Sequence, residues 1–207
     1  SRRIYITDTE INHLAHKLAH PTEIIIPTHF DTQLAKPLMR KRAIFHKIDG
    51  LHGHVHLHPH IRPKTVSNPP KVMVRRLLGD GIHDSDEILQ IPENWLEGLS
   101  IFTADENEVT GNPWNLIQNV ANMDGVITQS VTLASEAVLL GVPTLLISKA
   151  KRGFLDRLKS DGYPLFIAKE KDESILAQWL AGIHLTSELE LPDWPNTRSE
   201  LLEIIKH

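Results

Sequence analysis

The sequence predicts an α/β fold in which a Rossmann-like parallel sheet is flanked by helices. Short apolar runs alternate with amphipathic stretches along most of the 207 residues, which is the order that strand–helix–strand units produce. Residues 124–148 read as strand, polar turn, helix, Gly-Val-Pro turn and strand. A unit this compact requires parallel strands. The composition, 41% hydrophobic and 23% charged, is that of an ordinary globular protein.

Residues 1–48 alternate between strand and helix patterns. Apolar residues recur at helical spacing at Ile11, Leu14, Ala15 and Leu18, which predicts a helix with one apolar face. Short apolar runs between polar stretches predict strands. We interpret residues 1–48 as a partial N-terminal α/β segment. Its expected strands are 4–7, 23–26 and 43–48, and its expected helices are 11–18 and 33–39.

A connector rich in proline and histidine follows at residues 49–70. Its histidines occupy alternate positions, so in an extended strand all of them would project from one face. Neighbouring rings would then lie about 6–7 Å apart, because each residue advances ~3.3 Å. That spacing is too wide for easy binding of one tetrahedral zinc ion, so we expect a strand with one solvated face and no metal site. The residues are Pro59, Pro63, Pro69 and Pro70, and His52, His54, His56, His58 and His60.

Residues 71–190 are predicted to form the Rossmann-like domain, and residues 191–207 add a C-terminal helix. Apolar runs of strand length alternate here with stretches of helical periodicity. The expected strands are 71–78, 99–103, 126–127, 144–147 and 165–168. The expected helices are 86–96, 114–121, 154–159, 173–180 and 197–206, besides one that begins near Ser130.

The helix near Ser130 carries the strongest local signals. A hydroxyl of Ser130 or Thr132 can accept an otherwise unpaired N–H of the first turn. Gly141 suits a left-handed helix end, and Pro143 prevents the helix from continuing. In a parallel sheet such a helix begins at the carboxyl ends of the strands. Its free N–H groups and positive dipole end attract phosphate.

These segments resemble the GT-B superfamily, which includes MurG-like glycosyltransferases and UDP-GlcNAc 2-epimerases. The family that the chain resembles most specifically is the DUF354 family of glycosyltransferase-like proteins. The resemblance is carried, in order along the chain, by residues 6–10 with 17–21, residues 50–59, and residues 130–143. The last segment is the most specific of the three. Many relatives have a glycine-rich turn where this chain has Thr128-Gln129-Ser130-Val131.

The resemblance implies a glycosyltransferase-like protein that binds a nucleotide sugar, of which a UDP-sugar is the expected one. Glu136 would hold the ribose hydroxyls, and Ser130, Thr132 and Ser135 would contact the diphosphate. The structural alternatives are that Glu136 is a solvent-exposed helix residue and that the three hydroxyl residues only cap the helix. Arg75 ends a predicted strand, where its guanidinium could pair with a phosphate. No metal ion or other cofactor is required by this chemistry.

Asp8 and Glu10 are the candidate catalytic residues, because they follow the first predicted strand at its carboxyl end. Helix capping by Asp8 and a first-turn role for Glu10 are the structural alternatives. The resemblance implies that residues 1–48 hold only the late part of a first domain. A nucleotide-sugar 2-epimerase, in which these carboxylates handle protons, therefore stays open beside the transferase. A non-catalytic module that binds a nucleotide or a partner chain also stays open.

Composition narrows the classes of partner. The net charge is −4, whereas a nucleic-acid-binding domain usually has a basic face. The chain has no cysteine, which fits a reducing cytoplasm. No apolar run reaches the roughly 18 residues of a membrane span. We expect a cytoplasmic protein without a transmembrane segment, and a homo-oligomer is compatible with the sequence.

Overall fold

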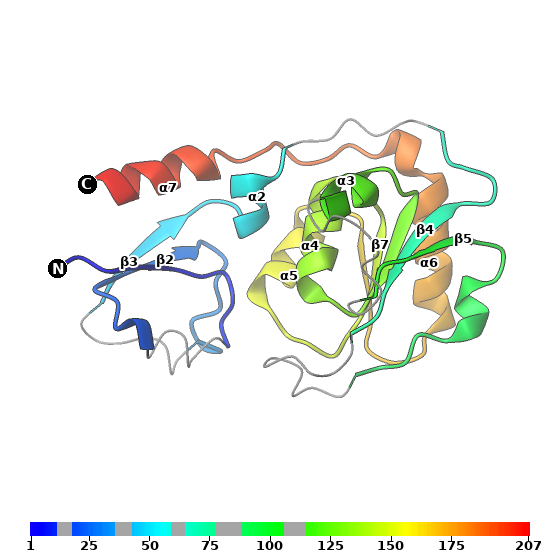
Figure 1. Ribbon diagram of the computed structural model, residues 1–207, viewed down its shortest axis with the longest axis horizontal. Helices are drawn as coiled ribbons and strands as arrows, with labels where there is room; N and C mark the ends of the chain where they lie inside the picture. The colour runs from blue at the N-terminus through cyan, green and yellow to red at the C-terminus, as the bar shows by residue number, and fades with distance from the viewer. Residues whose placement is uncertain (12–17, 36–42, 59–64, 78–87, 106–114) are drawn as a thin grey trace. The chain divides into compact units, whose positions relative to one another are not determined.

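The computed structural model describes residues 1–11, 18–35, 43–58, 65–77, 88–105 and 115–207. The chain forms two compact units. The first unit comprises residues 1–57, 151–160 and 193–207, and the second comprises residues 58–150 and 161–192. Both are α/β structures built on parallel sheets, which confirms the predicted fold class (Figure 1).

The first unit has a parallel sheet of three strands in the order β1-β2-β3. The strands are β1 (Ile4–Ile6), β2 (Glu23–Pro27) and β3 (Ile44–Ile48). The central strand is buried on both faces, which is why it reads as a continuous apolar run. Ile24 and Ile26 pack with Phe30 on one face, whereas Ile25 packs with Leu201 on the other. Leu201 belongs to helix α7 (Thr197–Lys206), which therefore covers the second face.

The histidine-rich segment forms a short helix, so the expectation of an extended strand was wrong. Helix α2 (His52–His56) brings His52 and His56 to the same side, with ring centroids 5.0 Å apart. His54 is buried, its Nδ1 accepts the N–H of Leu51 at 2.8 Å, and its ring meets the edge of Trp194. This capping bond and the burial of one ring favour the helical turn over the extended chain that the alternation suggested.

The second unit has a parallel sheet of five strands in the order β5-β4-β6-β7-β8. Helix α6 covers one face of this sheet, and α3 and α4 cover the other (Figure 1). The strands are β4 (Lys71–Arg75), β5 (Ser100–Thr103), β6 (Gly125–Thr128), β7 (Thr144–Ile147) and β8 (Leu165–Ala168). The helices are α3 (Leu116–Ala121), α4 (Val131–Leu139), α6 (Glu173–His184) and the 3-10 helices η1 (Glu93–Leu96) and η3 (Thr186–Glu188).

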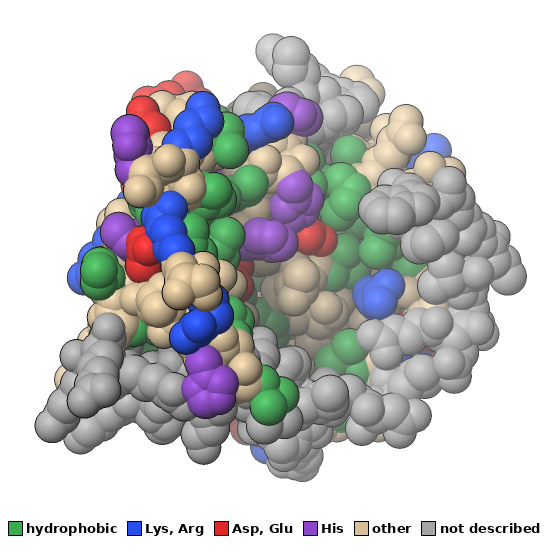
Figure 2. All heavy atoms as spheres, turned by 60° about the vertical axis from the view of Figure 1, so that its left-hand side comes forward, with side chains coloured by type: hydrophobic (Ala, Val, Ile, Leu, Met, Phe, Trp, Pro, Cys, Tyr) green, Lys and Arg blue, Asp and Glu red, His purple; other side chains and the backbone are tan. Residues whose placement is uncertain are grey.

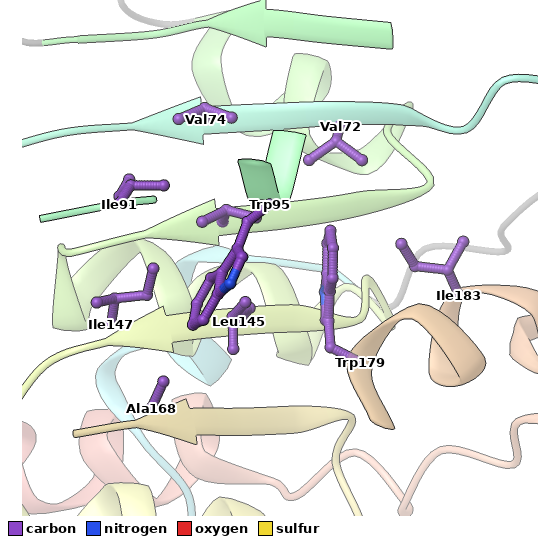
Figure 3. Close-up of a cluster of buried hydrophobic side chains, with 10 residues drawn as sticks. Val72, Val74, Ile91, Trp95, Leu145, Ile147, Ala168, Trp179 and Ile183 are labelled. Carbon is purple, nitrogen blue, oxygen red and sulfur yellow. The ribbon is translucent and has the colours of Figure 1, made fainter. Parts of the chain in front are cut away.

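The core beneath α6 is centred on two tryptophans (Figure 3). The ring of Trp179 is fully buried, and its Nε1 donates to the carbonyl of Pro143 at 3.0 Å. Trp95 of η1 donates its Nε1 to Glu173 Oε1 at 3.0 Å. Each indole thus buries a large apolar area while its single polar group keeps a partner. The core also contains Val72, Val74, Ile91, Ile127, Leu145, Ile147, Ala168 and Ile183.

Most predicted elements of the second unit are confirmed, with one clear exception. The helix expected over residues 86–96 is reduced, in its described part, to the 3-10 turn at Glu93–Leu96. Pro92 immediately precedes that turn, lacks an N–H donor and restricts the backbone of Ile91.

Some predictions fall on residues outside the described part of the chain, namely 12–17, 36–42 and 59–64. These residues include most of the predicted helices 11–18 and 33–39. They also include Pro59, His60 and Pro63.

We predict that Gly125→Ala destabilises the second unit. A Cβ atom at residue 125 would lie 2.8 Å from both Ile183 Cδ1 and Trp179 Cζ2. Overpacking of this kind typically costs about 1–3 kcal/mol of unfolding free energy. Chemical denaturation should show this loss. The loss should shrink when Ile183→Val removes the Cδ1 atom in the same chain, and equal losses in the two backgrounds would contradict the steric explanation.

We predict that Glu23 stabilises the first unit near neutral pH and that this contribution is lost in acid. Arg2 NH2 donates to Glu23 Oε2 at 3.0 Å, and His46 Nε2 lies 2.8 Å from the same oxygen. The hydrogen bond from Arg2, with a smaller effect of His46, lowers the pKa of Glu23 from 4.5 to about 2.

A carboxyl group whose pKa is lower in the folded state stabilises the fold above its ordinary pKa. That contribution is lost as the pH falls from 4.5 towards 2. Glu23→Gln should therefore flatten this part of the curve of unfolding free energy against pH. Glu203→Gln, at an exposed position of α7, is the matched control. An acid limb that is the same for Glu23→Gln and for the wild type would contradict the role of Glu23.

Candidate functional site

The carboxyl edge of the five-stranded sheet is the first candidate site. Numbered within the second unit, the strand order is 2-1-3-4-5, so the direction of winding reverses between β4 and β6. At such a reversal the loops after the two strands diverge, and open α/β sheets bind their ligands in the crevice that results. The loops that leave this edge begin after Arg75 and after Thr128, which are register partners.

Helix α4 begins at this edge as predicted. Ser130 has an extended backbone, and its Oγ accepts the N–H of Leu133 at 3.3 Å. Thr128 Oγ1 accepts the N–H of Ser130 at 2.9 Å, which fixes the turn between β6 and α4. The far end of the helix closes as expected, because Gly141 has a φ of +78°. Both Ser130 and Thr128 thus act on the backbone, and the Ser130 hydroxyl is the cap of the helix.

The other candidate residues on α4 lie along one side of the helix. Thr132 is exposed, whereas Ser135 and Glu136 are half-buried. Residues 132 and 136 are one turn apart, so both side chains belong to the same stripe. The Ser135 hydroxyl donates to the carbonyl of Thr132 at 2.8 Å. Thr132 and Glu136 are therefore the positions of this stripe that are best placed for a ligand that approaches along the helix.

Arg75 lies on the same face of the sheet as α4. Val72 and Val74 point into the core under α6, so alternation along β4 directs Arg75 to the opposite face. Its NH1 donates to the carbonyl of Ala104 at 3.4 Å. The guanidinium of Arg76 pairs with Asp105, at 3.3 Å, and with Glu93, at 3.8 Å. Arg75, on the α4 face of the sheet, stays the predicted candidate for an anion.

Gln129 is a residue of this edge that sequence reasoning did not select. Its side chain is buried, and its Oε1 accepts the N–H of Leu77 at 2.7 Å. Its Nε2 donates to the carbonyl of Leu89 at 2.5 Å. Gln129 thus holds both ends of the segment that connects β4 with η1. The signal in the sequence is a polar residue directly after a buried strand, at the position where many relatives have a glycine-rich turn.

Asp8 and Glu10, the candidate catalytic residues of the first unit, have different environments. Glu10 is fully buried, and its Oε1 accepts the N–H groups of Asp31, at 3.1 Å, and Gly153, at 3.0 Å. Gly153 is the first residue of helix α5 (Gly153–Ser160). The Glu10 carboxylate therefore holds a loop and a helix start in place, and this contact gives it a structural role.

Asp8, in contrast, lines a pocket of about 300 Å³ at the carboxyl ends of β1, β2 and β3. His52 lines the same pocket. The structure thus brings together two residues from segments that were selected separately in the sequence. Among the described residues, no group of three or more histidine, aspartate or glutamate side chains could hold a metal ion.

Comparisons with known proteins give no relative for this chain. No family model, no curated protein and no solved structure matches it. Within the described part of the chain, none of the helices is long and apolar enough to cross a membrane.

We predict that Gln129→Ala destabilises the second unit. The variant leaves the N–H of Leu77 and the carbonyl of Leu89 without their side-chain partner. The expected loss of unfolding free energy is about 1–3 kcal/mol. Denaturant unfolding measures this loss. Gln178→Ala, at an exposed position of α6, should change stability by no more than about 0.5 kcal/mol. Similar effects of the two variants would show that the Gln129 hydrogen bonds contribute nothing to stability.

Proposed function

We propose that this chain binds a nucleotide sugar, with a UDP-sugar as the expected ligand, at the carboxyl edge of the five-stranded sheet. The observation that carries the proposal is the reversal of strand order between β4 and β6, with the start of α4 at the same edge. This combination of a crevice and a helix N-terminus is a common phosphate site in doubly wound sheets. The resemblance of residues 130–143 to a nucleotide-sugar segment supports the same ligand.

The roles of the residues follow from their positions. The diphosphate would lie at the first turn of α4, where the helix dipole and the hydroxyl of Thr132 favour negative charge. Arg75 would balance that charge from the end of β4, because it lies on the α4 face of the sheet. Glu136 would accept hydrogen bonds from the ribose hydroxyls one turn further along the helix, since a carboxylate offers two acceptor oxygens.

Binding is the part of the proposed function that these residues can explain. Glycosyl transfer would also need an acceptor held against the donor in a reactive geometry. Release of UDP from a UDP-sugar would identify a transferase, whereas conversion to the epimer without release of UDP would identify a 2-epimerase. Binding without either reaction would identify a non-catalytic nucleotide-binding module.

The proposal predicts that Glu136→Gln weakens UDP binding without unfolding the protein. Loss of a charge-assisted hydrogen bond to the ribose should cost about 1.5–3 kcal/mol of binding free energy. Titration calorimetry with UDP measures this change, and thermal unfolding checks that the fold is intact. Glu170→Gln, at an exposed position after β8, is the control and should bind UDP as the wild type does. Equal affinity of Glu136→Gln and wild type would contradict the ribose role.

Arg75→Gln separates the phosphate role from the nucleoside role. It should weaken the binding of UDP and leave the binding of uridine unchanged, because uridine has no phosphate group for Arg75 to bind. Backbone amide shifts of Val131, Thr132 and Leu133 should report UDP binding in the wild type. If millimolar UDP moves none of these amides, the proposed site is wrong.

A further inference from the structure

The pocket of the first unit has the features of a small-molecule site. Its volume of about 300 Å³ is at the lower end of the range for ligand pockets. It opens beside the residues that follow β1, β2 and β3, which is the edge where parallel sheets place their ligands. All the described residues that line it belong to the first unit. It therefore uses residues other than those of the nucleotide site proposed on the second unit.

The interior of the pocket is apolar. Ile25, Ile48 and Leu201 are buried residues of the core between the sheet and α7, and all three line the pocket. Val55 of α2 also lines it and packs against the same core. Ile6, which is 45% exposed, and the half-buried Val55 therefore supply the apolar surface that a ligand could cover.

Three polar side chains of the pocket lie in the turn after β1, and His52 of α2 adds a fourth. Thr7 Oγ1 accepts the N–H of Thr9 at 3.2 Å, and Thr9 Oγ1 donates to Asp8 Oδ1 at 3.2 Å. These bonds hold the turn, and with it the carboxylate, in a defined position. Among the described lining residues, Asp8 is the only carboxylate, none is a lysine or an arginine, and one histidine, His52, lines the pocket with Asp8.

This distribution of charge selects the class of ligand. A carboxylate attracts a cation and repels an anion, and a charge-assisted hydrogen bond is roughly twice as strong as a neutral one. Figure 2 shows basic, acidic and histidine side chains mixed with apolar ones over the face of the molecule that it presents. Within the described lining of the pocket, Asp8 is the acidic group that a cation can meet.

We propose that this pocket binds a small organic ammonium compound. The ammonium group pairs with Asp8, and the apolar body of the ligand lies against Ile6 and Val55, above the buried core. The proposal does not depend on nucleotide binding, because it uses residues of the other unit.

Three probes with the same ring and different head groups test this proposal: cyclohexylmethylamine, cyclohexylmethanol and cyclohexanecarboxylate. Titrations followed by amide chemical shifts should show binding of the amine, with shifts at Thr7, Asp8, Thr9 and Gly50. The alcohol should bind about tenfold more weakly, because it lacks the charge that strengthens the hydrogen bond. The carboxylate should not bind.

Asp8→Asn keeps the size of the side chain and removes its charge. It should lower the affinity for the amine about tenfold, to that of the alcohol, whereas Asp193→Asn, an exposed aspartate of the same unit, should have no effect. Val55→Phe should weaken all the probes by filling the pocket. If Val55→Phe does not fold, the chemical-shift changes of the wild type on adding the amine show by themselves whether it binds in this pocket. Equal binding of amine and carboxylate, unchanged affinity of Asp8→Asn, or shifts elsewhere in the protein would overturn the proposal.

Discussion

Parallel pairing of β4 with both β5 and β6 is the constraint on which the second unit depends. Parallel strands need long connections, and these return the chain across the faces of the sheet. The central strands β6 and β7 are consequently buried at every position. The residues in the middle of these two strands are apolar and offer no polar group to a ligand. Polar side chains are confined to the ends of the strands, and the carboxyl ends share one edge. The position of the candidate nucleotide site therefore follows from the topology before any side chain is considered.

Several polar residues at the two carboxyl edges hold the backbone instead of facing a ligand. Gln129 and Glu10 are buried, and each binds backbone groups from two separate segments. Ser130 caps α4 in the same way. A buried polar side chain that has such partners is costly to remove. The candidates for ligand binding are thus fewer than the polar content of these turns suggests: Thr132, Glu136 and Arg75 in one unit and Asp8 in the other.

The parts of this structure that the sequence predicted are those with strong local signals. The segment from β6 through α4 to β7 combines continuous apolar strands, a capping serine and a glycine–proline stop, and all of these are found. The histidine-rich segment was misjudged because its alternation fits a strand, whereas contacts with Trp194, distant in sequence, favour a helix. Helix α6 extends to His184, past the predicted end at residue 180, and a Cβ atom at Gly182 would lie 2.9 Å from Phe166 Cζ, so the glycine leaves room for that ring. The roles of Gln129 and Glu10 depend on partners that are far away in sequence, so no local pattern reveals them.

Helix α5 makes both units discontinuous in sequence. It follows β7 and precedes β8 in sequence, yet it groups with the first unit, where Glu10 holds its first residue. The first unit is therefore assembled from three separate stretches of chain, and the second from two. Neither unit corresponds to one continuous stretch of the chain, so truncating the chain at a single position cannot produce either of them. An experimenter who wants the five-stranded sheet alone would have to replace residues 151–160 with a new linker between β7 and β8. The smaller unit could be made alone only as a rearranged chain in which its three stretches are rejoined.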